Sequence, residues 1–277
     1  MLTRIITSLI GVALMTPVMW FSDTYVFPIV LAFFIAVALY EIFACLNLKT
    51  KFYLTVPAYI LGIAMPFICK YMREFNNFSS FVFAVIFIYL IYLLFCAVIF
   101  HKTCDVNTLS MCFMFVIYII AGISSMQLLR ELPNGVFALI PVFLTAWVTD
   151  IFAYFTGKLI GKHKLCEAIS PKKTIEGSIG GIFFCILVCL IYAVIIFENK
   201  GNFLGYIFVF FVSIILSVIS QLGDLVMSLI KRKFGIKDFG KLFPGHGGVL
   251  DRFDSIIAVS PTLLIILLVV NSITNFI

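Results

Sequence analysis

Nine long apolar stretches follow one another along the 277-residue chain, and they constrain its fold more than any other feature. Each is about 20 residues long, the length that an α-helix needs to cross the hydrocarbon core of a bilayer. Lipid offers the backbone no hydrogen-bonding partner, so such runs indicate helices, whereas a β-barrel would show alternating segments of about ten residues. The expected spans are 5–21, 26–46, 53–71, 78–100, 107–127, 136–156, 178–197, 203–227 and 255–276.

The composition agrees with a protein that lies in a membrane. Hydrophobic residues make up 63% of the chain and charged residues only 12%, whereas a water-soluble domain needs about a quarter of its residues charged. A disordered chain is excluded as well, because disorder requires low hydrophobicity and many charges. The eight cysteines mostly lie within the apolar stretches without a CxxC pair, and we expect them to be packing residues. The predicted fold class is therefore all-α, a polytopic integral membrane helical bundle.

Lysine and arginine are unevenly distributed between the loops. With nine spans, 15 of the 19 basic residues fall on the side of the N-terminus. The positive-inside rule assigns that side to the cytoplasm. Met15 to Phe21 offers no small-x-small cleavage pattern, so we expect a retained helix over 5–21 and not a signal peptide. The predicted location is the cell membrane, as a multi-pass protein whose N-terminus and charged loops are cytoplasmic.

Polar residues gather in the second half of the chain. Up to about residue 140 the loops are short, whereas two long loops near 157–177 and 228–254 hold most of the charge. We therefore predict two regions. Residues 1–135 form a scaffold of transmembrane helices that is a candidate for lipid contact, and residues 136–277 form helices that carry the functional loops.

The first long loop has features of a phosphate site. Asp150 falls inside an expected span, where an ionised carboxylate is costly unless it pairs or faces a polar cavity. Ser170 followed by Pro171 is typical of a helix start, which would direct backbone N–H groups and the neighbouring lysines toward an anion. A solvated basic loop would also explain the lysines, but not the embedded Asp150. The candidate residues that follow the proline are Lys172, Lys173, Thr174 and Glu176.

The second long loop follows a polar stripe on an apolar helix. At 3.6 residues per turn, one face of the span that ends near residue 227 carries Gln221, Asp224, Ser228 and Lys231. A polar stripe that faced lipid would lack hydrogen-bonding partners. The stripe is therefore expected to face another part of the protein or a wet cavity.

A glycine-rich turn around His246 then leads to two carboxylates, Asp251 and Asp254, which are three residues apart and share a helical face. Carboxylates at a helix start can simply complement the helix dipole. Here a third carboxylate, Asp224, and a cluster of lysines and arginines accompany them, as Mg²⁺ bound with a polyphosphate requires. Arg252, between the two aspartates, is equally consistent with an internal ion pair.

The run Ser228-x-x-Lys231-Arg232-x₄-Lys237-Asp238-x₅-Pro244-Gly245-His246-Gly247-Gly248-x-x-Asp251-Arg252-x-Asp254 resembles the signature of the CDP-diacylglycerol synthase (phosphatidate cytidylyltransferase) family. Gly223-Asp224 and the stretch from Ser170 to Gly177 are also similar to that family. The first 140 residues match it only in hydropathy.

The resemblance implies transfer of CMP from CTP to phosphatidate, which gives CDP-diacylglycerol and pyrophosphate. It implies one or two Mg²⁺ ions bound by Asp224, Asp251 and Asp254, with Lys231 as a further catalytic residue. Lys231, Arg232 and Lys237 are expected to hold phosphates, and His246 to donate a hydrogen bond to one. The remaining expected substrate-binding residues are Ser228, Gly247, Gly248, Lys172, Lys173, Thr174, Glu176 and Asp150, the last also being open to a structural ion pair.

The expected partners are CTP, phosphatidate and the lipid bilayer, with a homodimer as a further candidate and no nucleic acid. A monovalent cation is a second candidate cofactor. One alternative is a related cytidylyltransferase that uses an archaeal-type ether lipid. An ion-coupled transporter is less favoured, because its internal repeats are not seen. A CDP-alcohol phosphotransferase is disfavoured because its Asp-Gly and Ala-Arg motif does not occur.

Overall fold

The structure is a computed structural model, and it describes residues 13, 16–71, 77–196, 203–243, 245 and 247–274. Eight long helices lie within these residues, and all are long and apolar enough to cross a membrane. This confirms a polytopic all-α membrane protein. The expected span 5–21 falls mostly outside the described residues. The helices are α2 (Val26–Cys45), α3 (Phe52–Lys70), α4 (Phe78–Ile99), α5 (Val106–Glu131), α6 (Gly135–Ile160), α7 (Ile175–Ile196), α8 (Phe203–Lys233) and α9 (Leu250–Thr274).

The last two helices extend further into the polar loop than the apolar runs predict. Helix α8 continues to Lys233, six residues beyond its expected end, and α9 begins at Leu250, five residues before its expected start. A span predicted from hydropathy ends where the charged residues begin. The helix itself can continue through charged residues when their charges are favourable for the helix dipole. Three basic residues occupy the last turn of α8, and Asp251 lies in the first turn of α9.

The predicted helix start at Ser170 is wrong. Residues Ser170–Thr174 form a strand, β2, which pairs antiparallel with β1 (Lys164–Cys166). Helix α7 begins after this hairpin, and its cap is Thr174, whose Oγ1 accepts a hydrogen bond of 3.1 Å from the Gly177 N–H. Thr174 is β-branched, which favours the strand, and its hydroxyl favours the helix cap. The cap of α7 therefore lies at Thr174, four residues after the predicted cap at Ser170.

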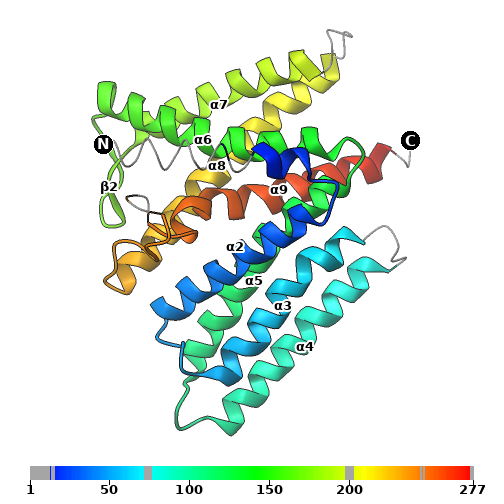
Figure 1. The fold of residues 1–277 in the computed structure, drawn as a ribbon. Helices are drawn as coiled ribbons and strands as arrows, with labels where there is room; N and C mark the ends of the chain where they lie inside the picture. The colour runs from blue at the N-terminus through cyan, green and yellow to red at the C-terminus, as the bar shows by residue number, and fades with distance from the viewer. Residues whose placement is uncertain are drawn as a thin grey trace. The chain divides into compact units, whose positions relative to one another are not determined.

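One compact unit, unit 1, comprises Met1–Glu131 together with Ile236–Asp251. In Figure 1 its helices α2, α3, α4 and α5 lie side by side. The core of this unit is apolar, with fully buried side chains at Ile35, Leu39 and Ile123. Gly62 in α3 has no room for a Cβ, which would lie 2.7 Å from Ile35 Cγ2. Small residues let transmembrane helices approach closely, so Gly62 is where α3 packs on α2.

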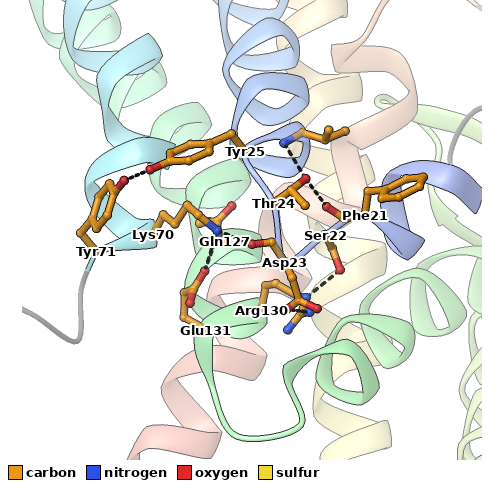
Figure 2. Close-up of polar contacts among 11 residues, drawn as sticks. Phe21, Ser22, Asp23, Thr24, Tyr25, Lys70, Tyr71, Gln127, Arg130 and Glu131 are labelled. Atoms are coloured by element: carbon orange, nitrogen blue, oxygen red, sulfur yellow. Dashed lines mark hydrogen bonds and ion pairs between the residues drawn. The ribbon is translucent and has the colours of Figure 1, made fainter.

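A polar cluster joins the start of α2 to the ends of α3 and α5 (Figure 2). Arg130 donates to Ser22 Oγ at 2.7 Å and pairs with Asp23. Lys70 donates to the Asp23 carbonyl at 2.8 Å and lies 3.9 Å from Glu131 Oε1. Polar side chains at helix ends that satisfy one another in this way fix the ends of neighbouring helices.

Removing the arginine of this cluster should lower stability. Arg130→Ala deletes a hydrogen bond to the buried Ser22 and the pair with Asp23, at an expected cost of about 1–2 kcal/mol. Thermal unfolding in detergent measures the effect, with Lys102→Ala, an exposed loop lysine, as the control. Equal melting temperatures for the two variants would contradict a stabilising role for the cluster.

The second compact unit, unit 2, comprises Leu132–Gly235 and Arg252–Ile277. Helices α6 and α7 run against each other, with α8 packed on both. A Cβ on Gly181 of α7 would lie only 2.9 Å from the Thr149 carbonyl of α6. Gly223 of α8 is as close to α9, where a Cβ would lie 2.7 Å from the Asp254 carbonyl. Glycines at these contacts therefore let α7 approach α6 and let α8 approach α9 closely.

Candidate active site

The polar stripe of α8 meets partners from other elements of unit 2, as predicted for a stripe that cannot face lipid. Gln221 Nε2 donates to the Ser178 carbonyl of α7 at 3.3 Å. One helical turn further, Ser228 Oγ donates to Asp224 Oδ1 at 3.3 Å. Lys231 lies close enough to Asp254 for their opposite charges to attract.

An ion pair between β2 and α8 lies at the centre of this cluster. Lys173 Nζ is 2.6 Å from Asp224 Oδ2, and each side chain retains less than a quarter of its accessible surface. The β1–β2 hairpin places Lys173 there, because the strand conformation separates it from its exposed neighbour Lys172. The structure therefore brings together two predicted site residues that are 51 positions apart in the sequence.

Two further carboxylates, from two other helices, lie near this pair. Asp150 of α6 and Asp254 of α9 both lie within electrostatic range of Asp224. Lys173 and Arg252 are in turn close enough to Asp150 for their positive charges to act on it. We call the group of Asp150, Lys173, Asp224, Lys231, Arg252 and Asp254 the charged cluster. Such a concentration of charge is costly in a membrane protein and indicates a site that handles charged ligands.

The charged cluster contains hard oxygen donors of the kind that Mg²⁺ prefers. Asp224 and Asp254 repel each other at their present separation, and a divalent cation would relieve that repulsion. Among the described residues no three His, Cys, Asp or Glu side chains are grouped closely enough to hold a metal ion. The predicted ligand set of Asp224, Asp251 and Asp254 therefore stays a prediction.

In unit 1, Asp251 holds the glycine-rich turn. Its Oδ2 accepts hydrogen bonds from the backbone N–H of Phe239 at 2.8 Å and of Gly248 at 2.9 Å. Gly245 and Gly247 have positive φ, at 78° and 82°. A Cβ on Gly247 would also collide with the Asp251 carboxylate, at 2.7 Å from Oδ2. Glycine is thus required in this turn by the backbone conformation and by a buried carboxylate.

Glu41 of α2 is the functional candidate that sequence reasoning missed. Its side chain is 3% exposed, and its carboxylate accepts hydrogen bonds from the backbone N–H groups of Val249 and Leu250, at 2.9 Å each. The missed signal was the presence of one carboxylate within an apolar span, which by itself marks a site of interest. The motif match did not extend to this part of the chain, so no role was assigned.

Other predicted residues have different surroundings. Thr174 is buried as the cap of α7, and Glu176 pairs with His163 at 2.7 Å between Oε1 and Nδ1. Arg232 is exposed and donates to the Ile169 carbonyl at 3.4 Å. Lys237 is exposed, and His246 lies outside the described residues. Of the first-loop candidates Lys172, Lys173, Thr174 and Glu176, the structure brings Lys173 to Asp224 and gives Thr174 and Glu176 hydrogen bonds within the protein.

Comparison with known proteins agrees with the sequence motif. Curated relatives include phosphatidate cytidylyltransferases from Staphylococcus saprophyticus, which is 45% identical over 157 residues, and from Staphylococcus aureus, which is 46% identical over 159 residues. Each alignment covers 57% of this chain and 58% of the relative, so it spans less than two thirds of either protein. The model of the Cytidylyltransferase family matches residues 2–270. Because this match covers almost the whole chain, the protein belongs to the Cytidylyltransferase family.

Proposed function

We propose that the protein is a phosphatidate cytidylyltransferase, which transfers CMP from CTP to phosphatidate and releases CDP-diacylglycerol and pyrophosphate. The observation that carries the proposal is the charged cluster, in which Lys173 pairs with Asp224 beside two further carboxylates. Intramembrane charges of this kind mark functional sites. Membership of the family and the names of the staphylococcal relatives support a cytidylyl donor and a phosphatidate acceptor.

The proposed reaction is a displacement at phosphorus. An oxygen of the phosphatidate phosphate attacks the α-phosphorus of CTP, a new P–O–P bond forms, and the bond between the α- and β-phosphates breaks. The leaving group is pyrophosphate. A phosphate monoester has its second pKa near 6, so phosphatidate is already largely dianionic at neutral pH and needs no strong general base. The main obstacle is repulsion between two polyanions, which positive charge and positioning reduce.

The residues of the charged cluster have distinct parts in this proposal. Lys173, Lys231 and Arg252 supply positive charge for the phosphates of CTP and phosphatidate. Asp224 and Asp254 would hold Mg²⁺, with Asp251 as the third predicted ligand. When bound, the ion supplies positive charge that offsets the charge of the triphosphate and of the departing pyrophosphate. Asp224 also orients Lys173 through their ion pair.

The membrane fold suits this pair of substrates. Moving a diacyl lipid into water costs about 0.8 kcal/mol per exposed CH₂, whereas CTP is water-soluble. The reaction must therefore occur at a membrane surface. The excess of lysine and arginine in the loops that carry the motif supports a cytoplasmic location for that surface.

Two differently labelled batches of CTP test the proposal. With Mg²⁺ and phosphatidate in detergent micelles, label in the α-phosphate should appear in a lipid product, and label in the γ-phosphate should appear in pyrophosphate. Removal of divalent ions with EDTA should abolish the reaction, and added Mg²⁺ should restore it, because the polyanions otherwise repel each other.

The assay also separates the alternatives. An archaeal-type ether lipid with the same phosphate group serves as the competing acceptor, and faster labelling of that lipid would replace phosphatidate in the proposal. Transfer of the γ-label to lipid, or a rate that EDTA leaves unchanged, would contradict metal-assisted cytidylyl transfer.

A further inference from the structure

Glu41 lies in an apolar, buried environment, which is unfavourable for a carboxylate that has no hydrogen-bonding partner. It belongs to α2, an apolar helix, and in unit 1 its side chain is almost fully buried. Each carboxylate oxygen accepts one backbone N–H, Oε1 from Val249 and Oε2 from Leu250, both at 2.9 Å. Burying a carboxylate without partners would cost several kcal/mol, so these two hydrogen bonds make its position tolerable.

The two amides belong to the start of α9. The first N–H groups of a helix have no partner within the helix, and a buried helix start needs outside acceptors. Glu41 supplies them for Val249 and Leu250, while Asp251 supplies one for Gly248. A negative charge at this end of a helix is favourable as well. The start of α9 is thus capped by a side chain about 200 residues earlier in the sequence.

The Glu41 carboxylate also explains why two nearby positions are occupied by glycine. A Cβ on Gly240 or on Gly248 would collide with Glu41 Oε1. Both glycines lie in the stretch Ile236–Asp251, which forms part of unit 1. The backbone at Gly240 and at Gly248 therefore lies directly against the Glu41 carboxylate, in addition to the two hydrogen bonds from Val249 and Leu250.

We propose that Glu41 is a positioning residue for the reaction. It fixes the backbone of Val249 and Leu250 and thereby the first turn of α9, and so sets the place of Asp251, the predicted metal ligand that lies in this turn and in the same unit. Glu41 acts through this backbone and does not itself contact substrate. The inference rests on the proposed cytidylyl transfer for its effect on rate, but its effect on the loop is independent of any activity.

Hydrogen–deuterium exchange of the purified full-length protein tests the structural part. In Glu41→Gln one oxygen becomes an NH₂ group that cannot accept from an amide, so peptides covering 239–250 should exchange at least about tenfold faster. Peptides from the α6–α7 region should keep their exchange rates. The matched control is Glu131→Gln, which removes a carboxylate of the same unit and should leave the exchange of 239–250 unchanged. Unchanged exchange of 239–250 in Glu41→Gln would overturn the inference.

Steady-state kinetics test the positioning role. Glu41→Gln should lower kcat about tenfold and leave KM for CTP within about twofold, because the interactions lost are those that place groups in the transition state. Glu41→Asp withdraws the carboxylate by one methylene, which makes room at Gly248. Gly248→Ala should therefore cost less activity in the Glu41→Asp background than in the wild-type protein. Additive effects of the two substitutions would refute the close fit. If the wild-type protein transferred no CMP, the proposed function would fail, while the exchange data would still decide the role of Glu41 in the loop.

Discussion

Replacing Asp254 by Asn is expected to lower the rate of cytidylyl transfer at least about a hundredfold while the protein stays folded. Asp254 lies within electrostatic range of both Asp224 and Asp150, so the charged cluster places three negative charges close together. In the proposed function Asp254 would be a ligand of Mg²⁺, and the neutral amide of asparagine would bind the ion far more weakly. The change is nearly isosteric, which confines its effect to charge.

The stability of this variant distinguishes a functional effect from a folding defect. Asp254→Asn removes a charge that two other carboxylates repel, so its melting temperature in detergent should equal or exceed that of the wild-type protein. Loss of function with unchanged or higher stability is typical of residues kept for activity. Asp251→Asn should also lose about a hundredfold in rate, but with a lower melting temperature because Asp251 accepts two backbone hydrogen bonds.

Asp105→Asn is the matched control for these variants. Asp105 is exposed before α5 and accepts a hydrogen bond from the Thr108 N–H at 3.1 Å, which the amide oxygen of asparagine can still accept. Its activity should stay within about twofold of the wild-type value. Near-normal rates in a folded Asp254→Asn protein would remove the basis for a metal site in the charged cluster.

Replacing Lys173 by Met is expected to lower kcat/KM for CTP about a hundredfold. Its Nζ is 2.6 Å from Asp224 Oδ2, and it is one of the positive charges of the cluster. Methionine keeps the length of the side chain and removes the charge, so the phosphates lose an electrostatic partner and Asp224 loses the group that neutralises it. Initial rates at varied CTP concentration measure the effect, and Lys162→Met, at an exposed lysine after α6, should change it less than twofold.

A double-mutant cycle examines the ion pair itself. Lys173→Met and Asp224→Asn each break the same contact, so the double variant should be much less impaired than the product of the two single effects. Multiplicative effects would mean that the two residues act independently, contrary to their contact. Lys173→Arg, which keeps the charge, should recover part of the activity, but not all of it, since a guanidinium differs from an ammonium in shape.

Much of the fold follows from local patterns in the sequence. Seven of the expected spans from 26 onward begin within three residues of a helix in the structure, because an apolar run of that length has few alternatives in lipid. The exception is α9, which begins five residues early because a helix can start among carboxylates that favour its dipole. The helix start predicted at Ser170 was wrong because a local signal was outweighed by a contact with another segment. Serine followed by proline is a common local signal for a helix, but pairing between β1 and β2 outweighed it.

By itself, the sequence determined the class of protein, the number and approximate bounds of the helices from 26 onward, and the family motif. These depend on the composition of single segments, which any segment expresses without its neighbours. Only the tertiary structure decided that Lys173 pairs with Asp224 and that Glu41 caps the start of α9. The physical reason is that both contacts join residues distant in the chain. A charged side chain buried in a membrane protein requires a partner, but the residues next to it in the sequence do not indicate which residue that partner is.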